Sequence, residues 1–376
     1  MLVGASEFHS GIVEQLKQIK GECPTGKPCL ALYAEREIDK LNRNVLPFFP
    51  GTDKGRATGD GIPPVQVNPK KQDVGSEGIV SALISKYCKV PENHAMSHPG
   101  PDSLRENHVR KIVIVTDFVG SGRRVREMLD AFALVASIQS WRSYGLIQFH
   151  VVCYSGTEQG LEVLRRHHLR PKVSSYIACP VIDEAFRGSE LGSVRLLCEK
   201  YPGKRSRYPF GFKDTGSLIA FSHGIPNNAP AVLHSSAGDW KPLFPHRSTV
   251  SSEIDKIADS NEMLVRNSER VLGIREARKV LSDSEGEIWV HAMLVLDAIQ
   301  SGARTITKLS ALTQIPTSHV NKVIELAKTA GWVTPKQSLT RLGQREIRGL
   351  KKYYLMDKKI VFPERKLYFP KQLRAP

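Results

Sequence analysis

The residues best placed to do chemistry lie between Lys111 and Arg124. Four apolar residues typical of a buried strand lead into Thr116 and Asp117, and the turn Gly120-Ser121-Gly122 follows before a helix begins. A strand that ends in an acid delivers that side chain to the carboxyl edge of a parallel sheet. Glycines let backbone N–H groups approach a phosphate, and a helix N-terminus adds partial positive charge. This pattern predicts an anion site, with a generic strand-to-helix turn as the alternative.

The same stretch resembles the phosphoribosyl-pyrophosphate (PRPP) loop of type I phosphoribosyltransferases. By position, Asp117 matches the acid that holds the ribose hydroxyls in that family, and it is the expected catalytic residue. Gly120, Ser121 and Gly122 match the turn around the 5′-phosphate. The resemblance implies a site for PRPP or a nucleotide, usually with Mg²⁺, where group transfer passes through an oxocarbenium-like ribose.

The stretch departs from the family at two places. Thr116 stands where the family has a first acid, and Arg123-Arg124 replaces the Gly-Thr that ends the loop. The arginines can replace a hydroxyl donor with charge, which keeps anion binding plausible. Arg36 follows an apolar strand where the resemblance places a pyrophosphate-contacting loop. Lys71 lies in a long loop that could close over a pyrophosphate, although loop lysines are more often simply solvated.

The pattern of elements around this site predicts an α/β fold. Residues 111–179 alternate strand, helix, strand, helix and strand, which is typical of a parallel sheet with crossover helices. The strands are continuously apolar, as expected when helices cover both faces of the sheet. Earlier, we expect a strand at Cys29–Tyr33 and a helix from Ala34 through Leu41. The helix after the glycine turn is expected to run to about Ser140.

A second block carries a resemblance to a bacterial phosphoribosyltransferase-like family found in conflict systems. Two short strands are expected at Ser217–Phe221 and Ala231–His234, with Pro226-Asn227-Asn228 between them and Trp240–Arg247 after them. The segment Leu32–Glu37 matches the same family. A plain turn remains the structural alternative for the asparagine pair. Residues 1–247 are therefore expected to form one phosphoribosyltransferase-like domain.

The positive charge of the chain is concentrated near its end. Of the net charge of +16, residues 301–376 supply +12, with 16 Lys and Arg against 4 Asp and Glu. Such a balance indicates an acidic polymer as partner, most often nucleic acid. A membrane surface is the weaker alternative, because no long basic amphipathic helix stands out.

The six cysteines show no metal-type spacing and no Cys-x-x-Cys pair. They are expected to be reduced, in a cytoplasmic protein without a structural metal. No signal peptide and no apolar run long enough to cross a bilayer are visible. The sequence shows neither a Ser-His-Asp order nor a Walker-type loop.

The C-terminal pattern predicts a winged helix-turn-helix over residues 285–350, a small α+β domain. Helices are expected at Glu287–Gln300 and Thr305–Leu312. A third helix, capped by Thr317-Ser318, should reach about Ala330, with a wing at Thr334–Thr340. The stretch resembles the winged-helix domains of prokaryotic regulators. Residues 248–284 are expected to be a linker and a connecting helix.

A winged helix of this charge is expected to bind nucleic acid, with a protein-interaction role as the alternative. The contacts are expected from polar residues of the third helix and the wing, namely Ser318, His319, Asn321, Lys322, Lys328, Lys336 and Arg341. The tail at 351–376 mixes basic and aromatic residues, which suits base stacking or a groove on a partner protein.

Proteins of this appearance accompany bacterial retrons, in which a reverse transcriptase makes an RNA–DNA hybrid (msDNA) that restrains a toxic effector. The resemblance therefore implies an anti-phage effector whose winged helix binds msDNA, the reverse transcriptase or both. Its activity, if any, would be glycosyl transfer or nucleotide processing. A PRPP-sensing, DNA-binding transcriptional regulator without catalysis is the main alternative, and a housekeeping transferase is the other.

Overall fold

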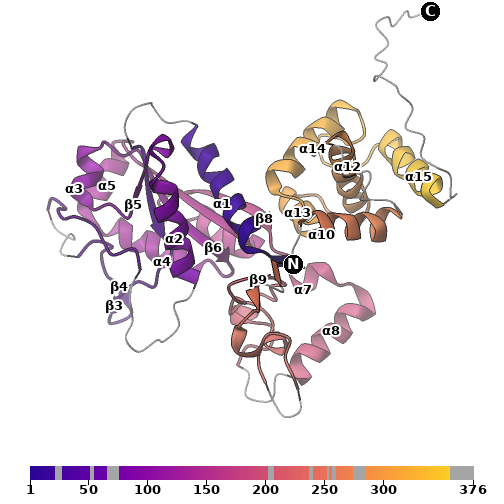
Figure 1. The fold of residues 1–376 in the computed structure, drawn as a ribbon, viewed down its shortest axis with the longest axis horizontal. Coiled ribbons are helices and arrows are strands. Elements are labelled where there is room, and N and C mark those ends of the chain that lie inside the picture. Colours follow the sequence, from indigo (N-terminus) through magenta and orange to yellow (C-terminus); the bar gives the residue numbers. More distant parts are fainter. Residues whose placement is uncertain are drawn as a thin grey trace, which may run out of the picture.

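The structure is a computed structural model of the 376-residue chain. It describes residues 1–21, 28–50, 55–65, 76–201, 207–236, 240–251, 254–255, 260–273, 281 and 284–355. Figure 1 shows an N-terminal α/β region, a smaller region below it and a helical C-terminal region.

A parallel five-stranded sheet forms the centre of the N-terminal region, and it confirms the predicted α/β fold. In spatial order its strands are β5 (Ala95–Ser97), β2 (Leu30–Ala34), β6 (Lys111–Val119), β7 (Gln148–Gly156) and β8 (Lys172–Ala178). The central strands β2 and β6 are almost wholly buried, which explains their continuous apolar sequences.

Helices cover both faces of this sheet. One face packs against α1 (Ala5–Lys20) and α2 (Ser76–Cys88). The other packs against α3 (Pro101–Glu106), α4 (Arg123–Ala133), α5 (Ala136–Ser143) and α6 (Glu158–Arg165). Residues of β6 alternate between the two cores, with Ile112 and Ile114 on one side and Val113 and Val115 on the other.

Three local predictions in this region are wrong. Residues 35–39 are not helical, because Glu35 N–H still donates to Val115 O (2.8 Å) and continues the pairing of β2 with β6. The antiparallel pair β3 (Lys40–Leu41) and β4 (Asn44–Val45) follows instead. The helix expected to reach Ser140 is broken at Val135, whose backbone is extended, into α4 and α5. The expected strand at 231–234 is a 3₁₀ turn, Ala231–Leu233.

A smaller region follows the sheet and lies below it in Figure 1. It contains α7 (Ile182–Ala185), α8 (Gly188–Lys200) and the short strand β9 (Ala220–Phe221). Strand β9 pairs in parallel with β1 (Leu2–Val3). The N-terminus of the chain therefore ties this region to the sheet domain.

The C-terminal region is a small helical domain with its own core. It contains α10 (Ser260–Asn267), a π-helical turn (Ser268–Leu272), α12 (Ser284–Gln300), α13 (Ile306–Thr313), α14 (Thr317–Thr329) and α15 (Arg341–Leu355). The expected wing is reduced to one antiparallel bridge between Val333 and Leu339.

The winged-helix domain contacts the outer strand of the sheet, β8, through α13 and α14 (Figure 1). Thr317 does not cap α14, because the N-cap residue is Pro316. Its hydroxyl instead donates to Ser175 O (2.7 Å) and Tyr176 O (3.2 Å) of β8. Ala178 N–H donates to Ser310 Oγ (3.2 Å). The helix-turn-helix thus satisfies backbone groups that an outer strand would leave to solvent.

The cysteines differ from expectation at one position. Cys29 is disulfide-bonded, so the prediction that all six are reduced is wrong. Cys88, Cys153, Cys179 and Cys198 are free. Burial raises the pKa of the Cys153 thiol to about 12, so this residue behaves as a small core side chain. Among the described residues, none of the helices has the length and apolar character needed to cross a membrane.

Candidate functional site

Asp117 lies near the carboxyl end of β6, at the edge of the sheet. Its side chain is 14% exposed. One carboxylate oxygen accepts the Phe118 N–H (2.8 Å) and the Thr116 hydroxyl (3.3 Å). The other lies 3.1 Å from His223 Nε2. The His223 ring is stacked on Phe221, with centroids 4.9 Å apart, so β9 positions it against Asp117.

A second carboxylate reaches the same place from the neighbouring strand. Glu35 directly follows β2, and its Oε2 accepts a hydrogen bond from the Thr116 hydroxyl. Its other oxygen lies 3.1 Å from Arg124 Nε. Thr116 therefore bridges two acids, and Glu35 supplies a carboxylate beside the position where the PRPP-loop pattern has its first acid. We call Glu35, Thr116, Asp117, Arg124 and His223 the Asp117 cluster.

The two carboxyl groups of this cluster have opposite pKa shifts. Burial raises the pKa of Glu35, and the nearby Arg124 opposes this rise only in part. Burial acts on Asp117 in the same direction, but hydrogen bonds from His223, Ser76 and the Phe118 amide hold its pKa below its usual value. Asp117 is therefore the charged member of the pair, while Glu35 retains its proton to higher pH.

The glycine turn between β6 and α4 is tightly enclosed. Gly122 has φ +70°, and a Cβ there would lie 2.7 Å from Gly160 O. A Cβ on Gly120 would lie 2.2 Å from the side chain of Asn228. The Thr157 hydroxyl donates to Gly120 O (2.6 Å) and holds the turn from the β7–α6 side. The two glycines are thus required by packing, because Gly122 lies against the backbone of Gly160 and Gly120 against the side chain of Asn228.

The turn leads into the N-terminus of helix α4. Arg126 N–H makes a 3.0 Å hydrogen bond to Gly122 O, the first of helix α4, so the preceding N–H groups have no partner within the helix. Arg123 is half-exposed and lies over the Phe212 ring, 5.1 Å from its centroid. Arg124 is also about half exposed. Two arginines and the first N–H groups of the helix therefore follow the half-buried Ser121 along the chain.

Of the other two predicted phosphate ligands, only Arg36 lies within the described residues. Arg36 is buried, and its guanidinium donates to Pro63 O (3.0 Å). Its pKa is lowered by burial. Lys71 lies outside the described residues.

The predicted nucleic-acid residues differ in their exposure to solvent. The exposed ones are Asn321, Lys322, Lys336 and Arg341, and the half-buried ones are Ser318, His319 and Lys328. Ser318 follows Thr317 at the β8 contact, and its Oγ is buried without a hydrogen-bond partner in the described chain. Lys328 Nζ lies 2.8 Å from Glu325 Oε1 on the same helix. The exposed face of α14 therefore begins at Asn321, one turn after the contact with β8.

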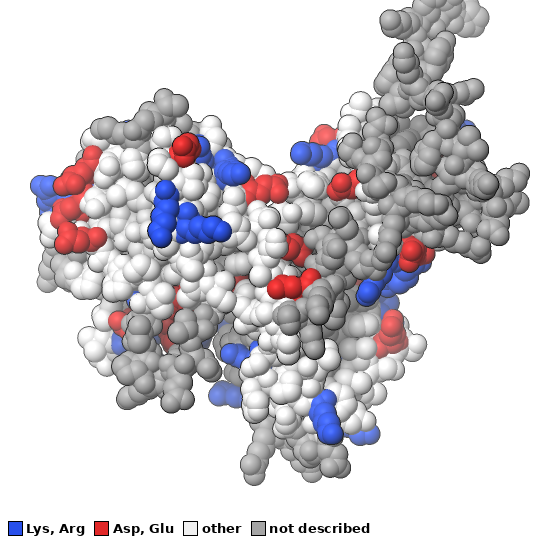
Figure 2. Space-filling model, in the orientation of Figure 1, with Lys and Arg blue, Asp and Glu red and all other residues white. Residues whose placement is uncertain are grey.

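Positive and negative side chains are mixed on the face of the molecule that Figure 2 shows. On the face drawn in Figure 2, described Lys and Arg are scattered among Asp and Glu and form no continuous basic patch. Half of the Lys and Arg of residues 301–376 come after residue 350, in the stretch whose side chains lie outside the described part. The basic aromatic tail at 351–376 thus remains a prediction.

Comparison with protein families identifies both regions. Residues 64–246 match the family model PRTase-CE, which spans Asp117 and the glycine turn. Residues 293–375 match a family described as wHTH-PRTase associated. The chain combines a phosphoribosyltransferase-like (PRTase-like) domain with a winged-helix domain. No curated protein and no solved structure gave a match. The PRTase-like match begins after Glu35, so it says nothing about that residue.

Sequence reasoning missed several members of this PRTase-like site. Glu35 was visible as an acid after a strand, but Arg36 beside it was preferred as the ligand. His223 is separated from Asp117 by more than a hundred residues, and only the packing of β9 brings them together. The Pro-Asn-Asn turn marked Asn228 in the sequence, but nothing in the sequence indicated that its side chain lies against Gly120.

Proposed function

We propose that the PRTase-like domain binds PRPP or a nucleotide at the Asp117 cluster. One observation carries this proposal: two carboxylates, Arg124 and a glycine turn at a helix N-terminus converge at the carboxyl edge of a parallel sheet. Asp117 accepts hydrogen bonds from the ribose hydroxyls. The phosphate lies on the turn, where N–H groups and the two arginines neutralise its charge.

The donor set fits Mg²⁺, which prefers carboxylate oxygens and substrate phosphates. Glu35 and Asp117 both reach the Thr116 hydroxyl, so they are close enough to hold one ion together with a diphosphate. A bound Mg²⁺ would neutralise charge on a departing diphosphate. For this arrangement Arg124 has to leave Glu35 and turn towards the phosphates. Arg124 is half-exposed, so little packing opposes that movement.

We further propose that the winged-helix domain binds nucleic acid through the exposed part of α14 and the wing. The resemblance to conflict-system proteins supports a role as a retron anti-phage effector, restrained by msDNA or the reverse transcriptase. The pairing of a PRTase-CE match with a winged helix described as PRTase-associated is consistent with such a two-part device.

A sensor without catalysis is the second candidate, and one observation favours it. Every oxygen of Glu35 and Asp117 already has a partner within the cluster. Such a closed arrangement suits reversible binding of PRPP followed by a change in DNA affinity. Release of pyrophosphate from PRPP in the presence of free bases or nucleic acid distinguishes the effector enzyme from the sensor.

Titration calorimetry of the full chain with PRPP and MgCl₂ tests the binding site. We expect Asp117→Asn to weaken PRPP binding about 100-fold, since a charged hydrogen-bond acceptor is lost. Asp183→Asn serves as control, because this exposed carboxylate pairs only with Arg195 in the described structure. Equal affinity of both variants would reject the assignment of Asp117.

Isolation of the tagged full chain from its host tests the partner. Co-purified RNA–DNA hybrid with reverse transcriptase supports the retron effector. A footprint on a duplex operator, without reverse transcriptase, supports the PRPP-sensing regulator.

A further inference from the structure

Two histidines and a glutamate meet between α12 and α14, away from every residue used so far except His319. Glu287 and His291 are one turn apart on α12, with Glu287 Oε1 and His291 Nε2 separated by 4.0 Å. His319 enters from the first turns of α14, and its ring centroid lies 5.8 Å from that of His291. One ligand-type atom from each residue lies within 4.8 Å of the other two.

The histidine at the centre of this group is buried, and its ring lies beside that of His319. An imidazole nitrogen that makes no hydrogen bond can offer its lone pair to a metal ion. No described side chain makes a hydrogen bond to His291, because the 4.0 Å between its Nε2 and Glu287 Oε1 is too long for one.

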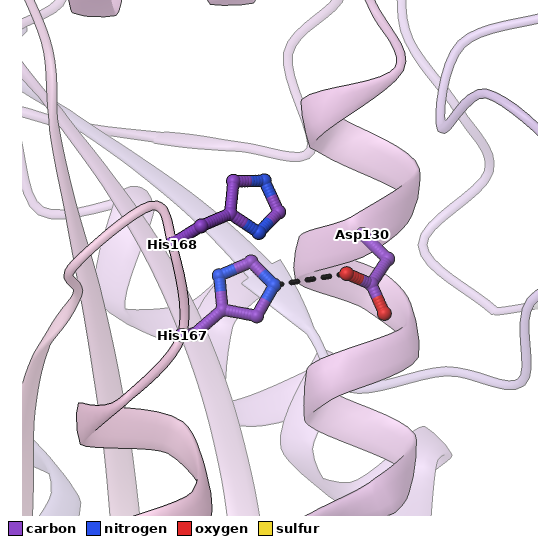
Figure 3. Close-up of side chains that lie close together, drawn as sticks. All are labelled: Asp130, His167 and His168. Carbon is purple, nitrogen blue, oxygen red and sulfur yellow. Dashed lines mark hydrogen bonds and ion pairs between the residues drawn. The ribbon is translucent and has the colours of Figure 1, made fainter.

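A second group of similar composition contains a histidine whose two ring nitrogens both have hydrogen-bond partners. Asp130, His167 and His168 also lie close together (Figure 3). There His167 Nε2 is 3.0 Å from Asp130 Oδ1, and its Nδ1 accepts the Leu169 N–H (3.1 Å). Both ring nitrogens are used, so hydrogen bonds explain this cluster without an ion.

We propose that Glu287, His291 and His319 form a binding site for a divalent transition metal of the zinc class. Two imidazoles and one carboxylate are a donor set that suits Zn²⁺, and three protein ligands leave a fourth position for water. Zinc–ligand bonds of about 2.0–2.1 Å bring ligand atoms to about 3.3 Å apart. Small rotations of Glu287, which is half-exposed, and of His319 close the present spacing.

The site joins α14 to α12 in the core of the C-terminal domain. His319 lies two residues after Thr317, the residue that holds α14 on β8. An ion shared by α12 and α14 fixes the start of α14, from which the exposed residues Asn321 and Lys322 project. Metal binding is thus expected to add rigidity at the place where the winged helix contacts both the sheet domain and solvent. The metal site itself does not depend on the proposed PRPP site.

Zinc binding to the full chain tests the proposal. After chelator treatment and dialysis, titration with ZnCl₂ should give one bound ion per chain. His319→Ala and Glu287→Gln should each weaken zinc binding by about tenfold or more, since loss of even an outer-shell partner costs about tenfold. His168→Ala, in the hydrogen-bonded cluster, should bind zinc as the unchanged protein does. Cobalt in place of zinc should show the visible absorption of a tetrahedral site.

Thermal unfolding provides a second readout. Added ZnCl₂ should raise the melting temperature of the unchanged chain and of His168→Ala, but not of His319→Ala. His291→Ala would be a poor test, because His291 is buried and its loss leaves a cavity that lowers stability by itself. The proposal is overturned if no zinc binds, or if zinc binds with unchanged affinity to the Glu287→Gln, His319→Ala double variant. Equal loss in His168→Ala would also overturn it.

Discussion

The Asp117 cluster and the exposed face of α14 arrange polar side chains in opposite ways. The cluster is mostly buried, and its side chains come from β6, from α4 and from the segments that follow β2 and β9. The polar residues of α14 come from one helix and face solvent. Buried polar groups depend on each other's geometry, whereas exposed ones act almost independently. Single substitutions should therefore have large effects in the first region and small, additive effects in the second.

The largest effect is expected where the cluster is tightest. Gly120→Ala places a Cβ 2.2 Å from Asn228, and the overlap should lower the free energy of unfolding by about 2–3 kcal/mol. Urea denaturation measures this change. The double variant Gly120→Ala, Asn228→Ala should regain part of the loss, because the obstructing side chain is removed.

Gly192→Ala in α8 is the matched control for this substitution. Its Cβ meets nothing within 4 Å, so the change should be neutral or stabilising by up to about 1 kcal/mol. If Gly120→Ala behaves like Gly192→Ala, the turn is not the closed structure described here.

The comparison also explains what the sequence could predict. The strand, Asp117 and the glycine turn lie within the twelve residues from Lys111 to Gly122, and local periodicity and turn chemistry were enough to place them. The same is true of the helices of the winged helix. Helix ends were less predictable: Thr157, a residue type favoured at N-caps, does cap α6 by accepting the Gly160 N–H (3.0 Å). Thr317 does not cap α14, because β8 offers its hydroxyl two carbonyl acceptors.

Contacts between distant segments had no sequence signal. Glu35 reaches the site because β2 pairs with β6, and strand order cannot be derived from the composition of either strand. His223 reaches Asp117 because β9 pairs with β1 at the N-terminus. The helix expected from Ala34 failed for a related reason: pairing with Val115 holds the chain extended through Glu35. Tertiary pairing overrode the local preference there.

A substitution at the contact between α14 and β8 should lower stability less than Gly120→Ala does. Thr317→Val keeps the side-chain volume but removes the hydrogen bonds to Ser175 O and Tyr176 O. We expect the free energy of unfolding to fall by about 1–2 kcal/mol. Amide hydrogen exchange should become faster in the winged-helix segment that faces β8. Thr329→Val is the control, because that hydroxyl is bonded to Glu325 O within the same exposed helix. Equal exchange in both variants would show that the hydroxyl of Thr317 does not hold the domains together.

Ligand binding at the Asp117 cluster should depend on pH through Glu35. Because the pKa of Glu35 is raised by burial, this carboxyl keeps its proton above its usual range near 4.5. It must lose that proton to hold Mg²⁺, so PRPP affinity should rise as pH increases through the raised pKa and then level off. Asp117 has a lowered pKa, so it is already charged throughout this pH range and does not contribute to the pH dependence of PRPP affinity. Glu35→Gln should bind PRPP more weakly and lose the pH-dependent rise. A rise that persists in Glu35→Gln would assign it to another group.

The smallest effects are expected on the exposed face of α14. Lys322→Ala should weaken binding of duplex or RNA–DNA hybrid oligonucleotides a few-fold and reduce the salt slope of log K by about 1, independently of base sequence. Lys328→Ala should change the slope less, because Glu325 at 2.8 Å already neutralises this lysine. Fluorescence anisotropy at several salt concentrations measures both. If Lys322→Ala instead abolished binding, the polar residues of α14 would act as one unit, as those of the Asp117 cluster do. The two regions would then not differ in the way proposed.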